Sequence, residues 1–321
     1  MIDKDATDER GVFLVQVPHL RASIMPLFAI DKRDLAMRPK GCGTLFRINP
    51  WGACVTAYHV IEDLLELHGG EPVLKEHARL IALELEGIPY GAPRIRPEQW
   101  RNFEGMFVLA GRKSTFGQPD MLTNVTELAS LMVQRSPNAT GAAAFLGMDL
   151  RRWKPSLGEQ VTALGFADLD LSKENAAADR PISQYLYGSR ATITDIEPFD
   201  PNRGRPWPFF RVDKDWPGGM SGGPVINAAG HVVGVVSTGI SFAAAGSAVF
   251  FAGNHHAESM FRAVDPGAPG HIFCYGGFDA GGKVAMIAPT QEAFEAMPGA
   301  AALLDSGPMS FDPSTGNYIC V

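Results

Sequence analysis

The sequence has no run of about 18 consecutive apolar residues, the length that a membrane-spanning helix needs, so no membrane partner is expected. It also has no cluster of Lys or Arg, and its formal net charge is -7. A protein held on nucleic acid by phosphate contacts needs a basic surface, so no nucleic-acid partner is expected either. Of the 321 residues, 45% are hydrophobic and 20% are charged, which is typical of a globular protein with a large core.

Cysteine is scarce, and the four present do not form CxxC pairs: Cys42, Cys54, Cys274 and Cys320. The first ten residues are acidic where a secretory signal peptide is basic and then apolar, which predicts a cytoplasmic protein. Cysteines in a reducing compartment stay as thiols, so we expect no disulfide and no metal site. A Cys42–Cys54 disulfide is the alternative.

Short segments rich in β-branched and aromatic residues recur along the chain, bounded by Pro, Gly and Asp. They form two groups, separated by a segment rich in Ala, Gly and Pro at 134–156. Helical patterns are few and lie at 60–67, ended by Gly69-Gly70, and at 290–297. Many short strands with few helices indicate an all-β protein built of barrels or a sandwich.

Two motifs carry the chemistry. Gly218-Gly-Met-Ser221-Gly-Gly-Pro-Val precedes a predicted strand at 232–236, and its glycines allow a tight turn that points backbone N–H groups into one space. A serine hydroxyl is a weak nucleophile until a base takes its proton. Thr56-Ala-Tyr-His59 supplies such a base at the end of another predicted strand.

Both motifs resemble those of trypsin-like serine proteases, and they are also similar to those of bacterial high-temperature-requirement proteases. Gly43-Thr-Leu-Phe46 matches the strand that this family places upstream of the histidine, while Tyr58 departs from the family's alanine. The resemblance implies a chymotrypsin-like fold of two six-stranded antiparallel β-barrels, with short helices and a C-terminal extension. The order His, acid, Ser differs from that of α/β-hydrolases and subtilisins.

The resemblance also divides the chain. It implies an N-terminal barrel at 1–135 that carries the histidine and the acid. A C-terminal barrel at 136–262 carries the serine and the specificity pocket, and an extension at 263–321 has no assigned role.

In the family's pattern Ser221 is the nucleophile, His59 is the general base, and the N–H groups of Gly219 and Ser221 form the oxyanion hole. The family's acid begins an Asp-x-Ala-x-Leu strand, which is matched here by Glu127-Leu-Ala-Ser-Leu. Glu127 is therefore the expected acid, provided that its extra methylene is accommodated. Asp120 is the alternative catalytic acid, and Asp149 lies after the strand.

Substrate contacts follow from the same resemblance. Asp215, six residues before Ser221, corresponds to the base of the side-chain pocket and implies a preference for Arg or Lys. Ser237, Thr238 and Gly239 correspond to the strand that pairs with an extended substrate, so the expected partner is a protein or peptide. No cofactor is expected, because acyl transfer by a base-activated serine needs none.

Met220 stands where trypsin has the aspartate that pairs with a newly cut N-terminus, so that activation is not expected. Control is expected instead from an activating protein partner, a ligand or the C-terminal tail. Two other functions use the same fold. One is a catalytically inactive homologue that binds extended peptides, and the other is a structural protein that cuts itself once.

Overall fold

The structure is a computed structural model of the 321-residue chain. The residues that it describes are 7–34, 38–49, 52–91, 95–113, 116, 121–134, 143–149, 153–169, 185–237, 245–254, 274–282, 284–288, 291–312 and 317–320.

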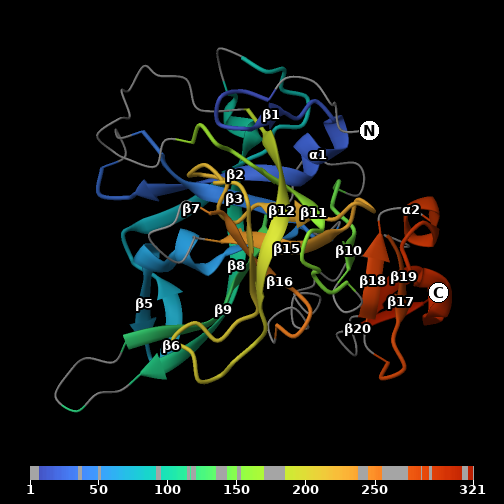
Figure 1. The fold of residues 1–321 in the computed structure, drawn as a ribbon. Helices are drawn as coiled ribbons and strands as arrows, with labels where there is room; N and C mark the ends of the chain where they lie inside the picture. The colour runs from blue at the N-terminus through green and yellow to red at the C-terminus, as the bar shows by residue number, and fades with distance from the viewer. Residues whose placement is uncertain are drawn as a thin grey trace.

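The first barrel is a closed ring of six strands from the N-terminal part of the chain (Figure 1). In ring order the strands are β2 (Ile24–Asp31), β3 (Lys40–Arg47), β4 (Ala53–Ala57), β9 (Met121–Val133), β8 (Trp100–Lys113) and β7 (Ala78–Leu83). All pairs are antiparallel, and all five residues of β4 are buried. Leu27, Leu45 and Val55 are among the fully buried side chains that fill this barrel.

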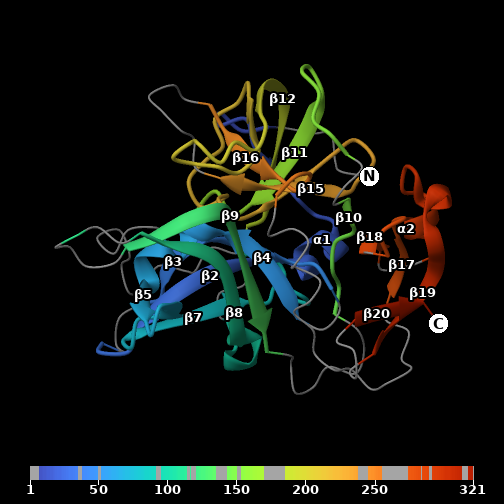
Figure 2. The same cartoon turned by 90° about the horizontal axis from the view of Figure 1, so that it is seen from below.

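The second barrel is built in the same way from the later part of the chain. Its strands in ring order are β14 (Pro224–Ile226), β11 (Gln160–Gly165), β12 (Tyr187–Glu197), β13 (Phe209–Val212), β16 (Ser247–Phe250) and β15 (Val232–Ser237). A further pairing of β14 with β15 closes the ring. The two barrels lie against each other, as Figure 2 shows. The predicted chymotrypsin-like fold of two six-stranded antiparallel barrels is therefore confirmed.

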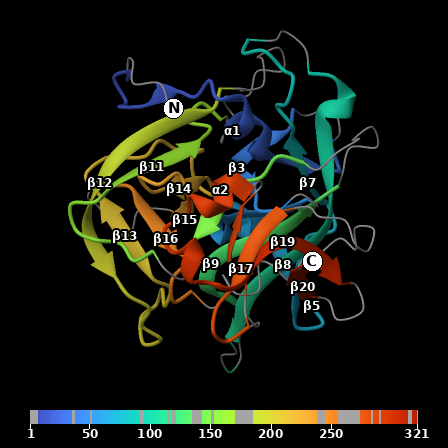
Figure 3. The same cartoon turned by 90° about the vertical axis from the view of Figure 1, so that its right-hand side faces the viewer.

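The last part of the chain forms a small antiparallel sheet beside the barrels, drawn in red in Figure 3. Its strands are β18 (Val284–Ala288), β17 (Cys274–Phe278), β19 (Leu304–Asp312) and β20 (Asn317–Cys320), with the short helix α2 (Gln291–Glu295) packed on β17 and β18. The two-residue strand β10 (Met148–Asp149) pairs with both β18 and β15. The sheet is therefore a continuation of the second barrel at the start of β15.

The N-terminal segment crosses between the barrels. Strand β1 (Phe13–Leu14) pairs with β12 of the second barrel, and helix α1 (Pro18–Ser23) then leads into β2 of the first. None of the helices in the described ranges has the length and apolar character needed to cross a membrane.

The prediction of a helix at 60–67 is wrong. The chain forms two 3-10 turns, η1 (Tyr58–Val60) and η2 (Glu62–Leu64), and then a hairpin of β5 (Leu65–His68) and β6 (Glu71–Leu74). Gly69 and Gly70 have φ of 62° and 91°, the conformation of a two-residue hairpin turn. The two glycines form the turn of a hairpin and do not end a helix. Residues 65–68 are a strand because they pair with residues 71–74.

Candidate active site

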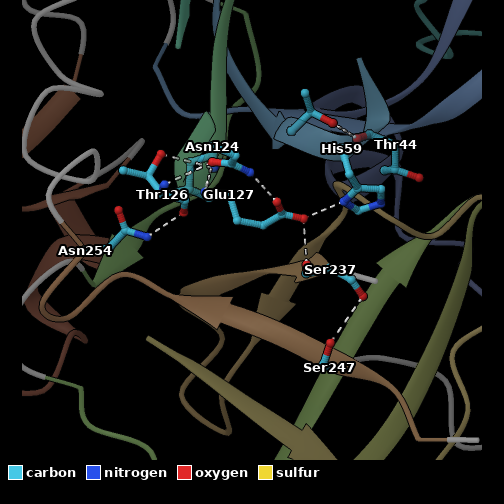
Figure 4. Close-up of polar contacts among 10 residues, drawn as sticks. Thr44, His59, Asn124, Thr126, Glu127, Ser237, Ser247 and Asn254 are labelled. Atoms are coloured by element: carbon cyan, nitrogen blue, oxygen red, sulfur yellow. Dashed lines mark hydrogen bonds and ion pairs between the residues drawn. The ribbon is translucent and has the colours of Figure 1, made fainter. Parts of the chain in front are cut away.

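His59 lies in η1, directly after β4 (Figure 4). Tyr58, the departure from the family's alanine, is 1% exposed and anchors this turn in the core. Burial raises the pKa of Tyr58 to about 12, and the carboxylates of Glu62 and Glu127 add to the effect. The His59 side chain is 20% exposed, so its ring lies at the surface of a rigid turn.

Glu127 lies at an irregularity of β9 that aims its side chain at His59. Val108 pairs with Ala129, but Ala110 pairs with Asn124, so β9 bulges over 125–128. Glu127 has φ of 58°, the one positive value among the described non-glycine residues. Bulges of this kind redirect side chains near active sites, and this one accommodates the extra methylene of a glutamate.

The Glu127 carboxylate is 4% exposed and accepts three hydrogen bonds. Oε1 lies 2.5 Å from His59 Nδ1 and accepts from Ser237 Oγ at 2.8 Å, while Oε2 accepts from Asn124 Nδ2 at 2.6 Å. A carboxylate only accepts, so His59 Nδ1 is the donor, and in a neutral imidazole the lone pair is then on Nε2. This is the arrangement of a histidine held ready to take a proton.

The loop of Ser221 is shaped by glycines in close contact with the first barrel. Gly219 and Gly222 have φ of 91° and 85°. A Cβ on Gly222 would lie 2.2 Å from both Thr44 O and Thr56 Oγ1, so no side chain fits there. Thr44 N donates to Ser221 O and Thr44 Oγ1 donates to Gly219 O, each at 2.8 Å.

Among the backbone N–H groups of residues 219–223, two differ from the other three in having no acceptor in the described structure. The N–H groups of Met220, Gly222 and Gly223 each donate to a backbone carbonyl. Within the described ranges, neither the Gly219 nor the Ser221 N–H has an acceptor in the protein. Two such donors beside a serine are available to an oxygen of a bound molecule.

The Ser221 loop and Glu127 are connected through β15. Gly222 N donates to Val236 O and Val236 N donates to Gly223 O, both at 2.8 Å. The next residue, Ser237, makes the hydrogen bond to Glu127. Among the described residues no hydrogen bond joins the Ser221 hydroxyl to His59, although both side chains lie at this interface between the barrels.

A family model matches a large part of this chain. Residues 43–235 match the family model of the trypsin-like peptidase domain, which is more than half of the chain. The chain belongs to the trypsin-like peptidase family. No curated protein sequence matches it.

Two solved structures resemble it in outline. Deg5 has 15% sequence identity and a TM-score of 0.45, over 72% of this chain and 84% of its own. The active form of the Rv3671c protease from M. tuberculosis has 16% identity and a TM-score of 0.42, over 75% of this chain and 80% of its own.

Some family positions predicted to contact substrate are described only in part. Asp215 is an exposed residue of the loop before Ser221, followed by the buried Trp216. Thr238 and Gly239 lie outside the described residues, and so does Asp120, the alternative acid. Asp149 is in β10, where it pairs with Met286 of the C-terminal sheet.

Sequence reasoning missed Asn124 and Asn254, and it assigned Ser237 to the substrate strand without its contact to Glu127. Asn124, Asn254 and the hydroxyl of Ser237 all contribute to holding the acid or its turn. The spacing Asn124-x-x-Glu127 is the one local signal that was available, because an Asn side chain often bonds to backbone two or three residues on. Asn254 reaches Thr126 O and Ser237 reaches the Glu127 carboxylate from the second barrel, so no local pattern marks them.

Cys42 and Cys54 make no hydrogen bond to the described residues of this site. Cys42 and Cys54 are free thiols, so the alternative disulfide between them is wrong. Burial raises the pKa of both thiols to about 12, which makes them unreactive. Of the side chains that the structure describes, no three His, Cys, Asp or Glu gather in a way that suits a metal ion.

Proposed function

We propose that this protein is a serine endopeptidase that hydrolyses peptide bonds through an acyl-enzyme on Ser221. One observation carries the proposal: His59 is held by a buried Glu127 whose carboxylate accepts from Nδ1. The imidazole is thereby fixed in the tautomer that accepts a proton at Nε2. Three residues from two barrels then have the roles of nucleophile, base and acid.

In the proposed reaction, Ser221 Oγ attacks the carbonyl carbon of the scissile bond and its proton passes to His59 Nε2. The imidazolium is stabilised by Glu127 and then protonates the leaving amine, which leaves an acyl ester on Ser221. Water, deprotonated by His59, hydrolyses the ester and returns Ser221 to its hydroxyl form. No metal or cofactor enters these steps.

The tetrahedral intermediate carries a negative oxygen that needs donors already in place. The Gly219 and Ser221 N–H groups, which have no acceptor in the described structure, support an oxyanion hole at this position. One donor of this kind is typically worth about 10²- to 10³-fold in kcat. Thr44 holds the next peptide, 219–220, through the Gly219 carbonyl, and the positive φ of Gly219 sets the angle between that peptide and the one that carries the Gly219 N–H.

We further propose a preference for Arg or Lys before the scissile bond. Its support is Asp215, whose carboxylate is exposed in the loop that leads to Ser221. A carboxylate there pairs with a cationic side chain and gives nothing to a neutral one. In a fluorogenic peptide library, Asp215→Asn is expected to abolish the preference, and cleavage without any preference in the unsubstituted protein would contradict it.

A peptide-binding module without catalysis is the second candidate. The absence of a hydrogen bond between Ser221 and His59 in the described structure favours it. Hydrogen bonds in unliganded active sites are often long and shorten only when substrate binds, so the same observation fits an enzyme that a partner or substrate orders. Only a chemical reaction at Ser221 separates the two candidates.

The test is labelling with a fluorophosphonate, which reacts with an activated serine. The unsubstituted chain is expected to label, Ser221→Ala and His59→Ala to abolish labelling, and Glu127→Gln to slow it by about 10³- to 10⁴-fold. Asp120→Asn is the matched control and is expected to label normally. A folded protein that never labels, alone or with added peptides, would establish the binding module instead.

A further inference from the structure

Asn124 makes three hydrogen bonds with one side-chain amide, and all three act on Glu127 or its turn (Figure 4). Its Oδ1 accepts from the N–H of Thr126 at 3.0 Å and from the N–H of Glu127 at 2.8 Å. Its Nδ2 donates to Glu127 Oε2 at 2.6 Å. The two backbone donors fix which end of the amide is oxygen, so the end that faces the carboxylate is an NH₂ group.

This contact matters because the backbone of Glu127 is in an uncommon conformation. A non-glycine residue with φ of 58° is costly unless its surroundings hold it there. Asn124 holds the turn from inside β9, and Asn254 of the second barrel, 4% exposed, donates from Nδ2 to Thr126 O at 2.9 Å. The turn is thus braced on both sides, with Glu127 between them.

We propose that Asn124 is a positioning residue for the acid, which deepens the proposed function and rests on it. The donor at Asn124 Nδ2 occupies Oε2 and leaves Oε1 for His59 Nδ1 and Ser237 Oγ. In this way the Asn124 amide orients the carboxylate, and the carboxylate in turn fixes the tautomer of His59. Asn124 therefore acts on proton transfer only through Glu127, in addition to holding the turn.

A purely structural role makes a different prediction, and an exchange of donor and acceptor separates the two. Asn124→Asp keeps an oxygen for the two backbone N–H groups, so the turn is retained. It replaces the donor to Glu127 by a second carboxylate oxygen, which repels Oε2 instead of bonding it. If Asn124 only caps the turn, this variant loses activity through that repulsion alone, and exchanging donor and acceptor between positions 124 and 127 restores nothing.

The first measurement is the rate of fluorophosphonate labelling of the full chain, with the melting temperature measured alongside. Asn124→Asp is expected to slow labelling by about 10- to 100-fold, the loss typical of one hydrogen bond to a charged group. Asn227→Asp is the matched control. Asn227 Oδ1 also caps backbone N–H groups, those of Ala229 and His231, at the end of the β14–β15 hairpin away from Ser221. It is expected to label at the parent rate.

The second measurement asks whether exchanging donor and acceptor restores function. In Glu127→Gln, the Asn124 NH₂ attracts the new amide's oxygen and turns its NH₂ toward His59, which forces the wrong tautomer. In Glu127→Gln combined with Asn124→Asp, the carboxylate at 124 accepts from that NH₂, so an oxygen faces His59 again. The double variant is expected to label at least about tenfold faster than Glu127→Gln alone.

The outcomes separate this inference from the function on which it rests. If the unsubstituted protein does not label, both are overturned. If it labels but Asn124→Asp labels at the parent rate, or if the double variant is no faster than Glu127→Gln, the positioning role alone is overturned. Should Asn124→Asp melt well below the Asn227→Asp control, the double variant still decides, because it is compared with Glu127→Gln and not with the parent.

Discussion

Gly222 and Gly230 have almost the same backbone conformation in very different surroundings. Their φ values are 85° and 86°, so an added side chain meets the same backbone strain at both positions. At Gly230 nothing lies within 4 Å of the added Cβ, whereas at Gly222 it would lie 2.2 Å from Thr44 O and Thr56 Oγ1. Comparing the two therefore isolates the close contact between the Ser221 loop and the first barrel.

Gly230→Ala is expected to lower the free energy of unfolding by about 1–2 kcal/mol, the cost of a left-handed alanine. Gly222→Ala is expected to cost at least about 1–3 kcal/mol more through overpacking, and to abolish fluorophosphonate labelling because the Ser221 loop must move. Urea unfolding and labelling measure the two effects. Equal losses of stability would mean that the loop yields to the first barrel without cost.

Some residues of the candidate site have a local signal in the sequence, and others have none. The sequence predicts roles for His59 and Ser221 because each lies in a short motif whose glycines or flanking strand are adjacent in sequence. Glu127 was chosen over Asp120 by a strand pattern alone, and its positive φ and the bulge of β9 were not visible in that pattern. Asn254 contacts the turn from the other barrel, which only the folded chain brings close.

At the scale of elements, a buried ion triad joins several strands of the first barrel. Glu84, directly after β7, pairs with Arg47 of β3 at 2.5 Å and with Arg101 of β8. Arg47 also donates to Ala22 O at 2.8 Å, which ties α1 to the same group. Burial alone would raise the pKa of Glu84, but the two guanidinium groups outweigh it and the pKa is lowered below 4.5.

Because the pKa of Glu84 is lower in the folded state, its contribution to stability is present above the unfolded value and is lost as pH falls through the folded value. Glu84→Gln is expected to destabilise the chain by about 3 kcal/mol at pH 7, since it leaves two arginines without their carboxylate. That difference is expected to shrink as the pH falls below about 4.5. Urea unfolding of both proteins at several pH values is the measurement, and a difference that grows on acidification would contradict this account.

The elements that the sequence predicted least well are those whose structure depends on distant partners. The strands of the two barrels were visible because alternating or fully buried apolar runs are local. Residues 65–67 have a helical pattern, yet pairing with 71–74 makes them a strand. The C-terminal sheet was not predicted, since Gly-rich strands such as β17 are stabilised by their neighbours and carry little signal of their own.

At the scale of the whole molecule, the N-terminal segment, residues 10–15, contacts both barrels. Val15 N donates to Leu186 O of the second barrel at 2.9 Å, while Tyr90 of the first barrel donates to Val15 O. Phe13 is 3% exposed, and its ring lies against Gly188, where an added Cβ would meet it at 2.4 Å. Arg10 pairs with Asp168 at 2.5 Å, but the Arg10 side chain is 40% exposed.

The Phe13 contact is buried and the Arg10 ion pair is exposed, so we expect Phe13 to contribute more to the free energy of unfolding. Phe13→Ala removes a buried ring and is expected to lower the free energy of unfolding by about 3–5 kcal/mol. Arg10→Ala removes an ion pair that water and salt screen, so its expected cost is below about 1 kcal/mol and falls further in high salt. Urea unfolding of both variants at low and high salt measures this. An Arg10→Ala loss that equals the Phe13→Ala loss and disappears in salt would mean that charge, and not the buried ring, joins the segment to the second barrel.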